Sequence, residues 1–375
     1  MAGIYLHIPF CKRKCAYCDF YSIAQIKYKH KFVEALCKEI KLRKEFLEDE
    51  KIQTIYFGGG TPSILSINQL DEILNSLNKN FKIDKNSEIT LEANPDDLSK
   101  DYLKDLSSVG VNRLSVGIQS FRDNDLLLMK RKHSVNQAIR SVKDAQDVGF
   151  NNISIDLIYG LPNLKIKDWE KNISEALKLK IQHISAYHLT IEPNTLFQKY
   201  HHTNKIKLPA EEESLSQFKL LKEKTAENGF LHYEISNFAK DGSLSLHNTN
   251  YWRGVKYLGL GPSAHSYNLT ARQWNIQKLP AYLAAISQGE IPMEIENLTE
   301  NEKYNDFIIT SLRTMWGLNI EKLKREFGEK YEMYFLKKSK KFIKENNMKN
   351  IDKNFKLTEK GKFISDNIMR ELLFD

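Results

Sequence analysis

Short apolar runs alternate with longer amphipathic stretches over the first 190 residues of the chain. Between the apolar runs, apolar residues recur at the spacing of a helix near residues 26–47, 67–80, 99–108, 134–148 and 167–179. The runs themselves predict six strands, near residues 4–8, 54–59, 88–93, 113–120, 152–160 and 183–190. This alternation predicts βαβ units with a parallel sheet, and six units predict an α/β fold built as a partial (β/α)6 barrel.

After residue 190 the pattern becomes less regular. Residues 192–195 (EPNT) predict a turn and residues 210–228 a helix, whereas the Gly-, Ser- and aromatic-rich residues 243–266 predict loop and short strand. From about residue 298 the chain is helical and charged, and LTEKGKF resembles the end of a small winged-helix-like unit. We therefore expect a core domain over residues 1–240, a connecting region over 241–297, and a helical, winged-helix-like C-terminal domain over 298–375.

Composition narrows the class of protein. With 375 residues and 41% hydrophobic content, the chain is long enough to bury a sizeable core. No run of about 18 apolar residues predicts a membrane span, and the N-terminus lacks the pattern of a secretory signal, so the expected location is the cytoplasm. The net charge is +8, but 13 of the 15 basic residues after residue 319 are Lys. This favours a solvated face over a nucleic-acid site and would also suit an anionic membrane surface.

Three of the four cysteines fall within eight residues, at Cys11, Cys15 and Cys18. Structural zinc normally takes four ligands in two separated pairs, and no second CxxC occurs here. His7 is a weak candidate for a fourth zinc ligand because it lies in a strand-like segment. An iron–sulfur cubane held by three thiolates would leave one iron open, as catalytic metal centres do.

Polar and glycine residues stand where several predicted strands end. Cys11 follows the first strand, GGGTP ends the second, Glu92 ends the third, Gln119 ends the fourth and Asp156 interrupts the fifth. Ligands of parallel α/β folds bind at this edge, so these residues predict one shared site. GGGTP fits neither the phosphate-binding P-loop nor the dinucleotide-binding GxGxxG pattern. Its missing side chains would let the backbone approach a ligand closely.

The spacing CxxxCxxC resembles the radical SAM superfamily. The motifs YLHIPFCxxxCxYCDF, FGGGTPS, LEANP, VGIQSF and IDLIYGLP resemble its coproporphyrinogen-oxidase-like branch over essentially the whole chain. The resemblance implies a [4Fe–4S] cluster on the three cysteines, whose open iron binds S-adenosylmethionine and cleaves it to a radical. It also implies a cofactor site in which Tyr5, Gly59 and Glu92 contact the S-adenosylmethionine beside the cluster. The same pocket would include Tyr17, Gly60, Thr61, Gln119, Arg131 and Asp156, positions that hold a second S-adenosylmethionine in the oxidase.

Two departures separate this chain from the oxidases of that branch. The oxidases carry CxxxCxxCxC, whereas Phe20 stands at the last position here, and they have a longer extension before the motif than the ten residues that precede Cys11. Both features resemble HemW-type haem chaperones. HNTNYW also fits their HNxxYW motif, which implies a haem site made by His247, Asn248, Tyr251 and Trp252. His265 and the pair His201–His202 are weaker candidates.

The resemblance therefore implies a chaperone that binds haem as cargo and passes it to an apo-haemoprotein, such as a respiratory membrane enzyme. A homodimer and a position at the inner membrane are further expectations at the level of the family. The alternative is an oxygen-independent coproporphyrinogen III oxidase that uses S-adenosylmethionine radical chemistry. A radical SAM enzyme that modifies nucleic acid is the least favoured alternative.

Overall fold

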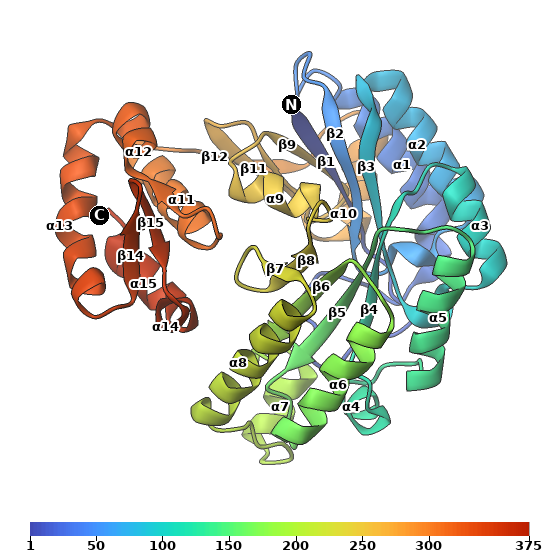
Figure 1. The fold of residues 1–375 in the computed structure, drawn as a ribbon. Coiled ribbons are helices and arrows are strands. Elements are labelled where there is room, and N and C mark those ends of the chain that lie inside the picture. Colours follow the sequence, from blue (N-terminus) through green and yellow to red (C-terminus); the bar gives the residue numbers. More distant parts are fainter. Residues whose placement is uncertain (375) are drawn as a thin grey trace.

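The computed structural model describes residues 1–374. Its centre is a curved sheet of six parallel strands that follow one another in space as they do in sequence (Figure 1). The strands are β1 (Ala2–Ile8), β2 (Ile52–Gly59), β3 (Ile83–Ala93), β4 (Arg113–Gln119), β5 (Ile153–Tyr159) and β6 (His183–His188). They are apolar and mostly buried, as expected for parallel strands covered on both faces. The predicted six-stranded partial barrel is confirmed.

Helices cover the outer face of this sheet (Figure 1). They are α1 (Lys29–Leu42), α2 (Ile67–Asn80), α3 (Lys100–Ser108), α5 (Val135–Asp147) and α6 (Ile166–Lys178), and all five were predicted. Ser66 and Ser134 begin α2 and α5 with capping boxes, in which serine and glutamine side chains satisfy free backbone amides. Shorter elements escape a periodicity argument: α4 (Asp123–Leu128), α7 (Leu196–His202) and 3-10 turns at Ile26–Tyr28, Pro62–Ile64 and Pro95–Asp97.

The sheet continues beyond the six strands on both edges. On one side β8 (Asn237–Lys240) and β7 (Phe230–His232) follow β6, after the predicted helix α8 (Glu211–Glu227). On the other side β9 (Tyr257–Leu260) pairs parallel to β1. It is followed by antiparallel β10 (His265–Tyr267), β11 (Ala271–Asn275) and β12 (Met293–Asn297), with α10 (Leu279–Gln288) between the last two. Much of the stretch 241–297 is thus part of the barrel sheet.

One local prediction was wrong in part. Residues 243–266 were expected to form loop and short strand. They include the strand β9 and the start of β10, but they also contain the helix α9 (Leu246–Trp252), which lies inside the curve of the sheet (Figure 1). Ser245 caps this helix, and the Glu88 carboxylate accepts hydrogen bonds from the amides of Leu246 and His247. Seven residues are too few to be stable as a helix alone, so tertiary capping decides the conformation.

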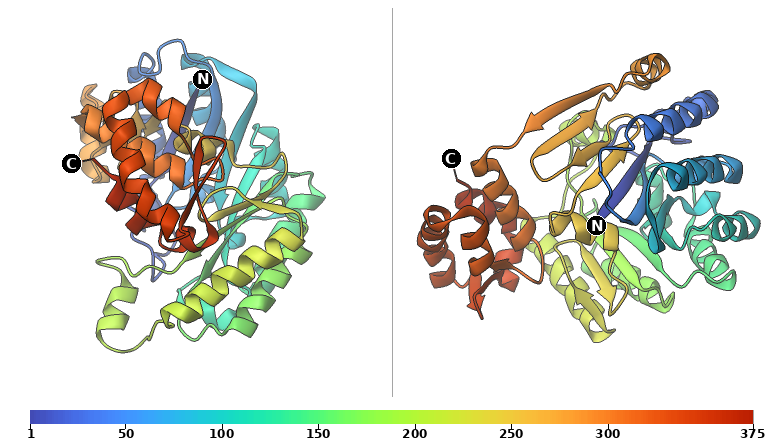
Figure 2. Two further views of the ribbon diagram at one scale, coloured as in Figure 1. Left: turned by 60° about the vertical axis from the view of Figure 1, so that its left-hand side comes forward. Right: turned by 90° about the horizontal axis from the view of Figure 1, so that it is seen from above.

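The C-terminal unit has its own sheet and its own core. Its elements are α11 (Glu300–Leu312), β13 (Leu318–Asn319), α12 (Ile320–Phe327), α13 (Glu329–Lys344), β14 (Met348–Ile351), β15 (Asn354–Leu357), α14 (Glu359–Phe363) and α15 (Ser365–Leu372). Tyr304, Phe335 and Phe342 belong to an apolar cluster separate from that of the barrel. The unit stands beside the barrel edge that carries β9–β12 (Figure 2). This order of elements agrees with the predicted helical, winged-helix-like domain. Within the described part of the chain, no helix is long and apolar enough to span a bilayer.

A candidate cofactor pocket and a neighbouring aromatic cavity

A cavity of about 440 Å³ opens at the carboxyl ends of the parallel strands. We call it the cofactor pocket. The three clustered cysteines and eight of the nine residues predicted to bind a cofactor line it: Cys11, Cys15, Cys18, Tyr17, Gly59, Gly60, Thr61, Glu92, Gln119, Arg131 and Asp156. Residues from across 146 positions of sequence thus meet at one edge of the sheet, as the argument from strand ends predicted.

Residues 58–62 (the glycine loop) fit closely against the start of residues 9–25, which carry the three clustered cysteines (the cysteine loop). Gly59 has a φ of +102°, and a Cβ on Gly60 would lie 2.7 Å from the carbonyl oxygen of Phe10. Glycine is therefore required at both positions, at the first by conformation and at the second by space. The loop then places the Thr61 hydroxyl 3.3 Å from Cys11 Sγ, to which it donates a hydrogen bond.

Arg131 connects the cysteine loop to the ends of β3 and β4. Its guanidinium donates to Cys15 Sγ at 3.4 Å, to Asn94 Oδ1 at 2.6 Å and to the Gly117 carbonyl at 2.5 Å. These three hydrogen bonds tie the cysteine loop to the strand ends that form the pocket. Gln119 ends β4 with a φ of +71°, a conformation that non-glycine residues rarely adopt and that often marks functional sites. Asn94 was missed as a site residue, although it lies within the LEANP motif.

Two buried carboxyl groups face this pocket. Glu92 accepts a hydrogen bond from the Tyr56 hydroxyl at 2.8 Å, and Asp156 accepts one from the Ser115 hydroxyl at 3.3 Å. Burial raises the pKa of Glu92 to about 7, and the nearby Asp156 charge adds to this shift. Burial likewise raises the pKa of Asp156 to about 6. Both groups would be stabilised as carboxylates by a ligand that carries a positive charge.

The three cysteines suit an iron–sulfur cluster better than a single metal ion. All are free thiols on one loop, and burial raises the pKa of Cys11 and brings that of Cys18 to about 11. In residues 1–374, no three His, Cys, Asp or Glu side chains converge as a mononuclear site requires. A cubane spreads its thiolates over different irons and does not need such convergence. His7 is unsuited as a fourth zinc ligand, because Tyr5 and the Tyr21 carbonyl occupy its two ring nitrogens.

Tyr5 is the one predicted cofactor residue that does not line the cofactor pocket. Its hydroxyl lies 3.2 Å from His7 Nδ1, and its ring packs beside Gly58 and Tyr56. It faces a second, larger cavity of about 1020 Å³, which we call the aromatic cavity. The contact between Tyr5 and S-adenosylmethionine stays a prediction.

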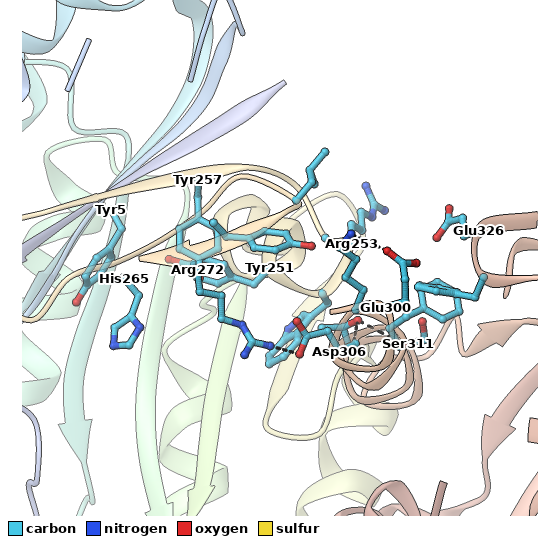
Figure 3. Close-up of a pocket in the computed structure, with 18 of the residues that line it drawn as sticks. Tyr5, Tyr251, Arg253, Tyr257, His265, Arg272, Glu300, Asp306, Ser311 and Glu326 are labelled. Atoms are coloured by element: carbon cyan, nitrogen blue, oxygen red, sulfur yellow. Dashed lines mark hydrogen bonds and ion pairs between the residues drawn. The ribbon is translucent and has the colours of Figure 1, made fainter. Parts of the chain in front are cut away.

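The aromatic cavity lies between the barrel edge and the C-terminal unit (Figure 3). The barrel side is formed by β1, the cysteine loop, α9 and β9–β11, and the opposite side by α11 and α12. Its walls include the rings of Tyr5, Phe20, Tyr21, Tyr251, Trp252, Tyr257, Tyr267, Phe307 and Phe327. Phe20, at the position of the fourth oxidase cysteine, lines both cavities and is 66% exposed. The two cavities are thus immediate neighbours.

The structure divides the four residues predicted to bind haem. Tyr251 and Trp252 line the aromatic cavity, whereas His247 and Asn248 do not. His247 is 2% exposed, with Nδ1 2.8 Å from the Thr54 hydroxyl and Nε2 2.8 Å from the Tyr251 hydroxyl. Burial lowers the pKa of His247 to about 3, so its imidazole is neutral. Both of its ring nitrogens have partners, and neither is available to iron in this conformation.

The weaker histidine candidates for haem binding lie in different places. His265 lines the aromatic cavity and is exposed there. His201 and His202 lie on the exposed end of α7 and line neither cavity. The sequence offered no signal that would rank His265 above the HNxxYW motif, because its access to the cavity depends on the packing of the C-terminal unit.

Comparison with known proteins identifies relatives over the full length of the chain. Residues 5–176 match the family described as "Radical SAM superfamily", and residues 298–364 match the "HemN C-terminal domain". "Heme chaperone HemW" of Bacillus subtilis is 33% identical over 376 residues, covering 100% of this chain and 99% of the relative. The protein of the same name from Lactococcus lactis is 33% identical and covers 99% of this chain and 97% of the relative.

Among solved structures, the coproporphyrinogen III oxidase HemN from Escherichia coli has a closely similar fold. The TM-score is 0.86 at 23% sequence identity, over 99% of this chain and 89% of that chain. The similarity includes both the barrel and the C-terminal unit.

Proposed function

The chain belongs to the HemW family of the radical SAM superfamily, and on this premise we propose that it is a haem chaperone, which binds haem as cargo and delivers it to apo-haemoproteins. The aromatic cavity is the observation that carries this proposal. Ligand pockets for organic molecules usually have volumes of roughly 300–1,000 Å³ with mostly apolar walls. A cavity of about 1020 Å³ with flat aromatic walls and charged rims suits a flat macrocycle with two carboxylates.

The cofactor pocket supports a second part of the proposal. Cys11, Cys15 and Cys18 hold a [4Fe–4S] cluster, and the surrounding eight residues bind S-adenosylmethionine. When bound, the cluster supplies an electron that can cleave S-adenosylmethionine reductively. The chain's own contribution is positional: Thr61 and Arg131 donate hydrogen bonds to cluster thiolates, and the buried carboxylates Glu92 and Asp156 pair with positive charge on the cofactor.

Partners and location are further parts of the proposal. We propose that the acceptor is an apo-haemoprotein such as a respiratory membrane enzyme, and that the chain works in the cytoplasm, as a monomer or homodimer, peripherally at the inner membrane. The 13 lysines after residue 319 support contact with an anionic membrane surface, since juxtamembrane basic residues are attracted to anionic lipids.

A titration combined with transfer tests the proposal. Anaerobically reconstituted protein is titrated with ferric haem, and the loaded protein is then mixed with apomyoglobin. We expect a Soret band that saturates at a defined stoichiometry, followed by a shift to the spectrum of myoglobin. Absence of saturable binding, or haem that never leaves the protein, would contradict the proposal.

Oxidation of coproporphyrinogen III is the second candidate function, and the intact cofactor pocket is the observation that favours it. An anaerobic incubation with S-adenosylmethionine, a reductant and coproporphyrinogen III separates the two functions. The chaperone proposal predicts no protoporphyrinogen IX above the level of a Cys15→Ser control, whereas its formation would establish the enzyme.

A further inference from the structure

His265 differs from the other histidines near the aromatic cavity. It lies on β10, exposed to the cavity, and neither ring nitrogen has a hydrogen-bond partner among residues 1–374. His7 also lines the cavity, but its nitrogens are 3.2 Å from the Tyr5 hydroxyl and 2.9 Å from the Tyr21 carbonyl. His247 is buried behind the wall, with both nitrogens bonded. Of these three histidines in the described part of the chain, only His265 can therefore offer a nitrogen lone pair to the cavity without breaking an internal hydrogen bond.

We propose that His265 is the axial ligand to haem iron in the aromatic cavity and that Arg253 binds a haem propionate. The proposal rests on the haem-binding function proposed above and specifies its site. A neutral imidazole is a common axial ligand of haem iron. His265 lies on the barrel side of the cavity, opposite the C-terminal unit. A haem bound to it would lie between the aromatic side chains of both units (Figure 3).

The local fold holds His265 in position. A Cβ on Gly259 would lie 2.0 Å from the His265 carbonyl oxygen, so β9 can approach β10 this closely only with glycine there. The Trp274 ring, on the paired strand β11, lies 5.9 Å from the imidazole with the planes 30° apart. The indole nitrogen of Trp274 donates to Glu294 at 3.1 Å, which fixes this ring in turn. These contacts restrict the imidazole, and restriction before binding reduces the entropy that it loses on binding iron.

The charges at the cavity rim distinguish Arg253 from the other cations. Arg272 pairs with Glu296 and Asp306, Lys303 pairs with Glu300, and Lys322 pairs with Glu326. Arg253 has no ion-pair partner in the described part of the chain, and its guanidinium stacks on Trp316 at 4.9 Å. Figure 3 shows Arg253 apart from His265 on the barrel side of the cavity, with Tyr251 between them. An arginine without a carboxylate partner is well suited to a propionate.

A second unpaired group lies in the same wall. The Trp252 indole nitrogen is buried and has no hydrogen-bond partner among the described residues, although Trp252 lines the cavity. A buried donor without a partner is uncommon and costs stability. A polar edge of a ligand in the cavity would relieve this cost if the indole turned slightly toward it.

His247 acquires a positioning role. Its Nε2 holds the Tyr251 hydroxyl, and the Tyr251 ring lines the cavity. On its other side, His247 stacks on Tyr56, with ring centroids 5.0 Å apart, and Tyr56 donates to Glu92 in the cofactor pocket. Loss of His247 is therefore expected to disturb the cavity wall without removing the iron ligand.

Haem titrations of five full-length variants test the assignment, read by Soret spectrum and by electron paramagnetic resonance. We expect His265→Ala to lose at least about tenfold in affinity, or 1.4 kcal/mol, and to change its ligation spectrum, with exogenous imidazole restoring the spectrum. His265→Gln provides a more conservative variant if His265→Ala folds poorly. Arg253→Ala should weaken binding several-fold and leave the spectrum unchanged. His201→Ala is the control for an exposed histidine outside the cavity and should bind like the wild type.

The outcomes for His247→Ala separate the two histidines. We expect weaker haem binding with the ligation spectrum of the wild type. A wild-type spectrum in both His265 variants, together with a changed spectrum in His247→Ala, would overturn the assignment of His265 and leave haem binding itself intact. If the wild-type protein shows no saturable haem binding, the proposed function fails and not merely the site.

Discussion

The two cavities are built on different physical principles. The cofactor pocket belongs to one sheet, and hydrogen bonds from Thr61 and Arg131 fix its cysteine loop against strand ends within one core. The aromatic cavity lies between two units that have separate cores. Polar contacts help to join these units, including the ion pair of Arg272 with Asp306 and the amide of Met315 bonded to the Tyr233 carbonyl.

This difference bears on how readily a ligand enters and leaves each cavity. A pocket inside one core is preorganised and opens only at a cost in core packing. Interfaces between domains that are polar in character usually permit relative motion. We infer that the cofactor stays bound through many cycles, whereas cargo enters and leaves as the C-terminal unit shifts.

The largest expected effect is the loss of the iron–sulfur cluster when one cluster cysteine is replaced, while haem binding in the aromatic cavity is retained. Cys15→Ser should abolish the [4Fe–4S] signal after anaerobic reconstitution, because the loop then offers only two thiolates. Haem affinity should change by less than about threefold, or 0.7 kcal/mol. Iron and sulfide analysis with a haem titration measures both. Cys37→Ser, in α1 and remote from the loop, is the matched control. A variant that keeps its cluster would show that the ligands are misassigned.

The next prediction concerns the buried carboxyl of Glu92. Its pKa of about 7 in the folded protein exceeds the ordinary 4.5, so the folded state holds the proton more tightly than the unfolded state. The stabilisation that this gives is complete below pH 4.5 and is lost as pH rises through 7. Relative to low pH, the cofactor-free protein therefore loses stability on the order of 3 kcal/mol at pH 8.

Glu92→Gln removes this ionisation. Without cofactor, urea unfolding should show the variant gaining stability relative to the wild type between pH 5 and pH 8, while its S-adenosylmethionine affinity falls about tenfold or more, or 1.4 kcal/mol. Equilibrium dialysis measures the affinity. Equal pH dependence of the two proteins would contradict the assigned pKa, and unchanged affinity would contradict the role in binding.

A smaller effect is expected at the contact between the two units. Asp306→Asn removes the ion pair with Arg272, which lies at the rim of the aromatic cavity. Because the pair is partly exposed, global stability should fall by only about 0.5 kcal/mol. Haem dissociation, measured by stopped-flow capture with apomyoglobin, should be several-fold faster. Glu175→Gln breaks an exposed ion pair with Lys178 on α6 and is the control. An unchanged dissociation rate in Asp306→Asn would argue against release through motion of the C-terminal unit.

A further expected effect is the pH dependence of stability that His247 contributes. Its pKa falls from the ordinary 6.5 to about 3 in the folded protein, so the unfolded state takes up a proton first as pH falls. Stability is therefore lost progressively from pH 6.5 toward 3. His247→Asn lacks this loss, and the stability advantage of the wild type should shrink between pH 7 and pH 5. A constant difference, measured by urea unfolding at both pH values, would show that His247 is not buried in neutral form.

The sequence predicted the cofactor side of this comparison better than the aromatic side. Strand periodicity and residues such as Glu92 and Asp156 at strand ends are local signals, and parallel topology brings them together. The helix α9 depends on capping by Glu88, which is 158 positions away from Leu246. For this reason its fold and the burial of His247 could not be read from HNTNYW alone.

The aromatic cavity shows a second limit of the sequence. The resemblance predicted Tyr5 at the cofactor, and nothing in the sequence indicated that its side chain would line the aromatic cavity. The sequence predicted His265 only as a weaker candidate for haem binding because no motif surrounds it. Its access to ligand arises from the packing of two units. Periodicity describes how one element buries a face and does not report which surfaces two domains leave between them.

The most direct test of the central claim measures the transfer of bound haem from this protein to apomyoglobin. The chain is loaded with one equivalent of ferric haem, excess free haem is removed, and apomyoglobin is added while the Soret region is recorded. We predict that the spectrum of the loaded protein converts fully to that of myoglobin at a rate independent of apomyoglobin concentration, because release from the cavity limits transfer. Failure to retain haem through the removal step, or no conversion after loading, would contradict the account of this protein as a haem chaperone.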